Sequence, residues 1–385
     1  MPGVVSAGPG DGAAVGPSPA LVQDTPGTIP NGPYIPLPKP GAQDKEPTAD
    51  GQVILKEALN HMAREDYTAA IPALDKLVSA EPVYIAYFLR AVCKAATADD
   101  DGAMDDVTKA LEIRTTPNAL ILRGQVLVQQ GKYEEGAQIF SITLNGLRRN
   151  NSPEKLRSNP ESLRMLGHCT RGLGVALSCM GGHDEVAANY YKAAGMVLTE
   201  PEPHLYVSMF AWCLQARTRN GASMTEEVRK GIAADKEGIQ KEWDEKKKGG
   251  ENPTGGAERA WPLYVAEYLI SDTADHDKLL AQASVARDKK TAVDQLCEAH
   301  YYIAMRLRND GKDDQAEQHL LAAINTGART MTEHVMARAE LQLLKNPPEP
   351  AAPAPRRPAP APAPSPAPAP REPLPDTDMP TSVGI

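Results

Sequence analysis

A period of 33 residues runs through the first part of this 385-residue sequence and limits the folds that the chain can adopt. Two sets of positions carry this period, the small residues Ala70, Ala103 and Gly136 and the large residues Ile54, Tyr87 and Leu120. Around these positions apolar residues are spaced three or four apart, which is typical of amphipathic helices. Gly131 separates the two helices of the clearest copy, residues 118–144. The period therefore predicts three helical hairpins over residues 54–144.

One amphipathic hairpin cannot bury its apolar face alone, so successive copies are expected to stack on each other. The small residues allow two helices to approach closely, and the large residues fill the space between neighbouring hairpins. A period near 34 residues with this pattern resembles the tetratricopeptide repeat. The resemblance implies an all-α, right-handed superhelix of helical hairpins.

Proline divides the chain. Residues 1–50 contain 11 of the 35 prolines and residues 346–385 contain 15. Because proline interrupts helices, we predict a disordered N-terminal arm over 1–50 and a disordered Pro/Ala-rich tail over 347–385. Between them we predict a three-repeat array over 51–145 and a second helical array over 146–346.

The second array is less regular. A polar stretch over 146–161 predicts a loop, and a fourth hairpin is expected to follow from Leu163 to about Ala194. Residues 204–217 are apolar on most faces, which predicts a buried helix. The final segment, residues 332–346, has the pattern of a single amphipathic helix and is expected to cap the stack.

Parts of this second array resemble the bacterial NlpI-type lipoproteins. The resemblance depends on Leu205-Tyr206, on Trp261-Pro262-Leu263-Tyr264 with Tyr268-Leu269, on CEAHYYIAMRLRNDGKDDQAEQHL and on the closing TEHVMARAELQLL. It implies a commonly dimeric envelope adaptor that gathers cell-wall hydrolases and delivers client proteins to a protease. This chain departs from that family by its two proline-rich arms, and it has no signal sequence or lipid-accepting cysteine as written.

Charge and cysteine content restrict partners and compartment. The net charge is −9, which argues against binding to nucleic acid or to an anionic membrane surface. No apolar run is long enough for a transmembrane segment, and residues 1–40 lack a secretory signal, so the sequence as written predicts a cytoplasmic protein. The NlpI resemblance would instead place it in the periplasm or cell envelope. The five cysteines lie in helical patterns and are expected to be buried thiols.

Three groups of polar residues are the candidates for chemistry: His183-Asp184-Glu185, the pair His300 and His319, and the acidic run Asp99–Asp101 with Asp105-Asp106. The first lies in a predicted turn, where acids favour a helix N-terminus, and the acidic run is expected to face solvent. The two histidines lie on the two helices of one hairpin, but no third ligand has clear spacing. We therefore predict no catalytic residues, metal or cofactor, and a protein that is not an enzyme. An enzyme using the residues around His183 or His300 is the alternative.

Stacked hairpins of this kind bind partners in the groove lined by their first helices. The predicted groove residues are mostly apolar and lie beside the packing stripe: Leu55, Leu59, Met62, Ile85, Phe88, Val92, Ile121, Gln125 and Val128. Such a groove suits an amphipathic helix or an extended apolar peptide. The sequence therefore predicts a scaffold or adaptor for protein partners. Alternatives remain open, in which the groove packs against the protein's own arm or against the second copy of a homodimer. A further alternative is a self-assembling structural protein whose arms bind the groove of a neighbouring copy.

Overall fold

The structure is a computed structural model that describes residues 45–150, 152, 158–197, 201–217, 226–248, 260–286 and 288–347. All regular structure in these residues is α-helical, which confirms the predicted fold class. The described helices belong to one compact unit. The arms predicted before residue 45 and after residue 347 lie outside the described residues.

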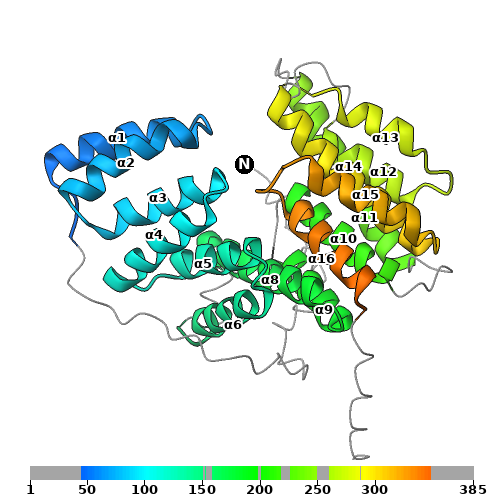
Figure 1. Ribbon diagram of the computed structural model, residues 1–385, viewed down its shortest axis with the longest axis horizontal. Coiled ribbons are helices and arrows are strands. Elements are labelled where there is room, and N and C mark those ends of the chain that lie inside the picture. The colour runs from blue at the N-terminus through cyan, green and yellow to red at the C-terminus, as the bar shows by residue number, and fades with distance from the viewer. Residues whose placement is uncertain are drawn as a thin grey trace, which may run out of the picture. The chain divides into compact units, whose positions relative to one another are not determined.

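Three hairpins occupy the region with the 33-residue period, and they follow one another along the chain in Figure 1. Their helices are α1 (Ala49–Met62) and α2 (Tyr67–Ala80), α3 (Tyr84–Ala96) and α4 (Asp100–Ile113), and α5 (Pro117–Gln129) and α6 (Tyr133–Asn150). The small residues Ala70 and Ala103 are fully buried, as the pattern predicts. The third, Gly136, is also buried, and a Cβ atom there would lie 2.7 Å from Cγ2 of Val128.

The turns inside the hairpins repeat with the same period. Glu65, Ala98 and Gly131 lie 33 residues apart, and all three have positive φ angles, of 59°, 61° and 80°. Only Gly131 adopts this left-handed conformation without a steric cost. Asp66 and Asp99 follow the first two turns and accept hydrogen bonds from backbone N–H groups in the first turns of α2 and α4. The period therefore reflects the backbone of the turn as well as the packing of side chains.

Nine further helices follow within the described residues. They are α8 (Pro160–Met180), α9 (Asp184–Gly195), α10 (Pro201–Arg217), α11 (Glu226–Lys248), α12 (Trp261–Ile270), α13 (His276–Ala283), α14 (Lys289–Asn309), α15 (Asp313–Asn325) and α16 (Thr332–Lys345). The loop predicted over 146–161 is wrong at both ends, because α6 continues to Asn150 and α8 begins at Pro160, and most of the residues between these helices lie outside the described residues. Pro201 begins α10, which is compatible with the first helical position because the N–H that proline lacks has no partner there.

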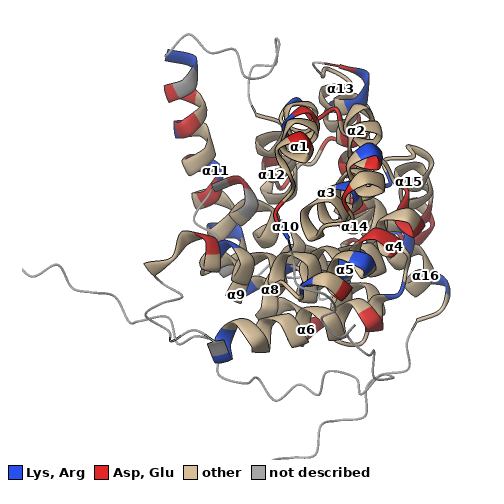
Figure 2. Ribbon diagram, turned by 90° about the vertical axis from the view of Figure 1, so that its left-hand side faces the viewer, with Lys and Arg blue, Asp and Glu red and all other residues tan. Residues whose placement is uncertain are grey.

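The second array is not a simple succession of hairpins. α8 pairs with α9, α10 with α11 and α14 with α15, but α10 also packs against α12 and α14. α16 covers α15, as a capping helix should, and it also packs against α14 and α8 (Figure 1). The charged residues of this half are concentrated on α11, whereas α8 and α10 are largely uncharged (Figure 2).

The core reflects this arrangement. One hydrophobic cluster extends from Ile121 in α5 to Ala339 in α16, and three smaller clusters lie within the first three hairpins. All five cysteines are free and buried, which confirms the prediction of buried thiols. None of the described helices combines the length and the apolarity that a membrane span needs.

Candidate functional site

Six of the nine predicted groove residues lie on α1 and α3 and remain partly accessible. Leu59 is 44% exposed, and the other five are half-buried. We refer to these six as the α1–α3 surface: Leu55, Leu59, Met62, Ile85, Phe88 and Val92. Four of them, Leu55, Met62, Ile85 and Phe88, pack at the edge of one small cluster that contains Ala58 and Leu74. The structure therefore brings residues from two helices together in one apolar patch.

Phe88 is held in place by the residues around it. Its ring stacks on Tyr84, with ring centroids 5.7 Å apart and an interplanar angle of 7°. The guanidinium carbon of Arg114 lies 4.3 Å from the centroid of the Tyr84 ring. The Tyr84 hydroxyl also lies 2.6 Å from Oγ1 of Thr116, the residue that caps α5. These contacts fix the first turn of α3, so Phe88 presents a preorganised face.

The part of the predicted groove on α5 is different. Ile121 and Val128 are buried, with 6% of each residue exposed, whereas Gln125 is exposed. A small cavity of about 70 Å³ separates Gln125 and Val128 of α5 from Thr332 and Val335 of α16. Helix α16 thus covers part of the third repeat, whereas the six residues of the α1–α3 surface stay partly accessible.

Two polar contacts hold α16 in this position. Nη2 of Arg338 donates to the carbonyl oxygen of Gln129 at 2.6 Å, and Arg329, just before α16, pairs with Asp100 at 3.0 Å. Asp100 belongs to the acidic run that was expected to face solvent. That expectation is wrong for Asp106 as well, which is 3% exposed and pairs with Arg90 and Lys94 of α3. Some acidic residues of α4 therefore form ion pairs with other helices, while Asp101 and Asp105 are exposed to solvent.

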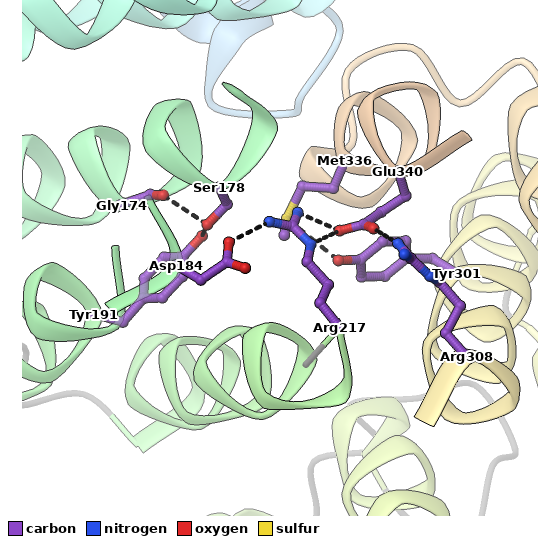
Figure 3. A network of polar contacts seen from close by, with 9 residues as sticks. All are labelled: Gly174, Ser178, Asp184, Tyr191, Arg217, Tyr301, Arg308, Met336 and Glu340. Carbon is purple, nitrogen blue, oxygen red and sulfur yellow. Dashed lines mark hydrogen bonds and ion pairs between the residues drawn. The ribbon is translucent and has the colours of Figure 1, made fainter. Parts of the chain in front are cut away.

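The cluster His183-Asp184-Glu185 opens α9, as predicted for a turn, and Asp184 takes part in a buried ionic network (Figure 3). Arg217 of α10 donates from Nη1 to Asp184 at 2.7 Å and from Nε to Oε1 of Glu340 at 2.6 Å. Arg308 of α14 donates to the other oxygen of Glu340. Burial opposes the charge of Arg217, but the two carboxylates more than offset it and raise the pKa of its guanidinium. The network joins α9, α10, α14 and α16.

The two histidines that the sequence places on the helices of one hairpin, His300 and His319, lie within hydrogen-bond distance of each other. Nδ1 of His300 lies 3.0 Å from Nδ1 of His319, and the ring of His276 lies 6.1 Å from that of His319. Burial, together with the two neighbouring imidazoles, lowers the pKa of His319 to about 4. A neutral ring can then donate to its neighbour. Across the residues that the structure describes, no group of three potential ligands is arranged to hold a metal ion.

Sequence reasoning missed the buried acids of the second array. Glu298 and Glu333 are 4% and 2% exposed, and Tyr302 donates to Glu333 at 3.2 Å. Burial raises the pKa of Glu333 to about 7, and it raises the pKa of Glu298 well above its ordinary value, with a further contribution from Glu333. A charged residue within the apolar stripe of a predicted helix is the signal that could have revealed such positions.

Because the pKa of Glu333 is raised, we predict that this residue makes the free energy of unfolding depend on pH. Between its ordinary pKa of 4.5 and about 7, the folded protein keeps a proton that the unfolded chain has released, so this group stabilises the fold less as pH rises. Glu333→Gln removes the effect, and we expect the variant to gain about 1–3 kcal/mol relative to wild type between pH 4.5 and 8. Urea denaturation at several pH values measures this difference.

Other groups also make the stability depend on pH. Burial lowers the pKa of His168 to about 4, so this histidine stabilises the fold more as pH rises, the opposite of Glu333. Comparison of the variant with wild type removes these contributions, because both proteins contain them. Glu57→Gln, at an exposed position of α1, is the control and should leave the pH profile unchanged. Parallel profiles for wild type and Glu333→Gln would contradict the assignment.

No protein-family model matches this chain, and no curated protein matches it. Among solved structures, a tetratricopeptide repeat protein from Parabacteroides merdae aligns with 78% of this chain and all of its own, with 10% identity and a TM-score of 0.40. Yeast Tom70 aligns over 73% of this chain and 77% of its own, with 12% identity and a TM-score of 0.25. The P58(IPK) TPR domain aligns over 77% and 99%, with 17% identity and a TM-score of 0.25.

Because these scores are low, the class of the protein is defined by its own helices. Consecutive hairpins with a 33-residue period, buried small residues and a repeated left-handed turn give it the fold of a helical-repeat protein, the fold that the resemblance to the tetratricopeptide repeat implies. The resemblance of its second half to the NlpI-type lipoproteins stays a prediction.

Proposed function

We propose that this protein is a non-enzymatic scaffold that binds a protein partner through the α1–α3 surface. The observation that supports the proposal is that α1 and α3 place six apolar side chains next to each other and leave them partly accessible to solvent. Contiguous apolar surface of this kind marks interaction sites in soluble proteins. Phe88, held by Tyr84, is the central anchor.

The partner that best fits this surface is an amphipathic helix. On α1 the apolar residues are spaced four and three apart, and on α3 they are spaced three and four apart. Two such rows are complementary to a helix whose anchors recur at every turn. The net charge of −9 favours a partner whose polar face is basic.

A designed peptide tests the proposal. We would label an 18-residue helical peptide with a leucine stripe at helical spacing and lysines elsewhere, and measure its binding by fluorescence anisotropy. We expect it to bind more tightly than a scrambled peptide of the same composition. Phe88→Glu should weaken binding by about 10- to 100-fold, because it places a charge at the centre of the apolar contact.

The control variant is Ile142→Glu, which adds the same charge at an apolar residue of α6 that is 38% exposed and lies outside the surface. It should bind the peptide as wild type does, and circular dichroism should show equal helicity for all three proteins. Equal binding of the stripe and scrambled peptides, or unchanged binding by Phe88→Glu, would contradict the proposal. Competition by a peptide of residues 31–41 would identify the N-terminal arm as an occupant of the same surface.

A further inference from the structure

A cavity of about 500 Å³ is lined mainly by the second array and includes none of the six residues of the α1–α3 surface. Its walls come from the N-terminal parts of α10, α12 and α14, from the second half of α11 and from the end of α13 with the residues that follow it. Met331 and Glu65, in the turn between α1 and α2, complete the lining. This volume is within the range of sites that hold small molecules or a single side chain of a partner. The function proposed above makes no use of it.

Aromatic rings form much of the wall. Trp243 and Trp261 line the cavity and are 7% and 9% exposed, and Tyr206 and Tyr264 line it with them. The ring centroids of Trp261 and Tyr264 are 6.4 Å apart. The indole N–H of Trp243 is buried and has no hydrogen-bond partner among the described residues. Aromatic faces, those of tryptophan above all, attract cations.

A buried carboxyl group also lines the cavity. Glu298 is 4% exposed, and its Oε2 accepts hydrogen bonds from the Tyr206 hydroxyl at 2.8 Å and from Nε1 of Trp261 at 3.1 Å. Both bonds end on the same oxygen, so Oε1 has no donor among the residues that the structure describes. A positively charged ligand would supply the missing partner.

The other charges in the lining have the same sign. Glu65, Glu202, Glu242 and Asp294 add carboxylates, and the one cationic side chain among the described lining residues, Lys290, is already paired with Asp294 at 3.2 Å. The carboxylates are too dispersed for a metal, since no three ligands are grouped in the described part of the chain. An organic cation, which needs aromatic faces and only one close carboxylate, fits this lining better.

We propose that this cavity binds an alkylammonium cation, with Trp243, Trp261 and Tyr264 around the alkyl groups and Glu298 as the counter-ion. Two sources share this chemistry, a free small molecule such as choline and a methylated lysine side chain of a partner protein. The proposal is independent of the α1–α3 surface, so either can fail alone.

Binding should release a proton. Burial and the neighbouring carboxyl of Glu333 raise the pKa of Glu298 well above its ordinary value. The empty site therefore keeps its proton at pH values where an exposed glutamate has lost it, and a bound cation favours release of that proton. The charged groups facing Glu298 are Glu333 of α16 and Glu202 of α10, and both favour the protonated form. Affinity for the cation should therefore increase as pH rises.

Isothermal titration calorimetry of the full chain with choline tests the proposal. The matched ligand is 3,3-dimethylbutan-1-ol, which has the shape of choline without the charge. We expect choline to bind at least about tenfold more tightly than the alcohol. Titrations in buffers of different ionisation enthalpy should report proton release with choline only. Equal affinities for the two ligands would overturn the proposal.

Two variants locate the site. Glu298→Gln keeps the shape of the side chain and removes its charge, and it should weaken choline binding by about tenfold or more while leaving the alcohol unaffected. Val285→Lys places a cation at a lining residue that is 59% exposed, where folding should tolerate it, and should have the same selective effect. Glu237→Gln, at an exposed position of α11, should change nothing. Equal choline affinity in all four proteins would refute the assignment.

A peptide containing trimethyl-lysine distinguishes the two sources of the cation. Tighter binding of this peptide than of choline, with loss of affinity for the unmethylated peptide, identifies a protein side chain as the ligand. The reverse order identifies a free small molecule. If neither choline nor the methylated peptide binds, the cavity is not an alkylammonium site.

Discussion

Replacing Arg217 with methionine is expected to lower the free energy of unfolding by about 3–5 kcal/mol. The side chain of Arg217 is 7% exposed, and that of Glu340, its partner, is fully buried. The substitution leaves Asp184 without this donor and leaves Glu340 with Arg308 as its only cation in the network. A buried carboxylate that loses a cation costs far more than an exposed one, because water cannot replace the lost partner.

Urea denaturation followed by circular dichroism measures this loss. Hydrogen exchange should show the largest increase in α16, because Glu340 attaches that helix to α10 and α14. Arg229→Met is the matched control, since Arg229 and its partner Asp272 are 40% and 86% exposed, and it should change stability by about 1 kcal/mol or less. Similar losses in the two variants would show that the buried network does not hold α16.

Replacing Phe140 with alanine should also cost about 3–5 kcal/mol, for a different reason. The ring is 1% exposed and fills the space between Gly124 of α5 and Gly172 of α8. A Cβ atom at Gly124 would lie 2.9 Å from the ring, and one at Gly172 would lie 2.5 Å from it. Neither glycine has a side chain that could fill the cavity left by the ring, so little of its volume can be recovered.

The same denaturation experiment on Ile142→Ala provides the control. Ile142 is on the same helix but is 38% exposed, and its loss should cost less than about 1 kcal/mol. We also expect the unfolding transition of Phe140→Ala to broaden, because the ring joins the third hairpin to α8 and repeat proteins depend on such interfaces for cooperativity. A loss no larger than that of Ile142→Ala would mean that the interface between α5, α6 and α8 closes around the missing ring.

The local structure of the first three hairpins could be predicted from the sequence by itself. The 33-residue period placed six helices, and the residues at its small positions are buried in the structure. These features follow from contacts between residues that are close in sequence, so a local pattern is sufficient to identify them. The meeting of His300 and His319 was foreseeable on the same grounds, because the two residues lie on the helices of one hairpin.

Only the tertiary structure decided where α16 lies, and with it the accessible part of the predicted groove. Arg338 and Gln129 are 209 residues apart, and Arg217 and Glu340 are 123 residues apart. No period relates such positions, because the angle between successive hairpins accumulates along the chain and determines which distant helices meet. That accumulated angle brings α16 against α8 and the third repeat, where Ile121 and Val128 are buried, and it leaves the α1–α3 surface open.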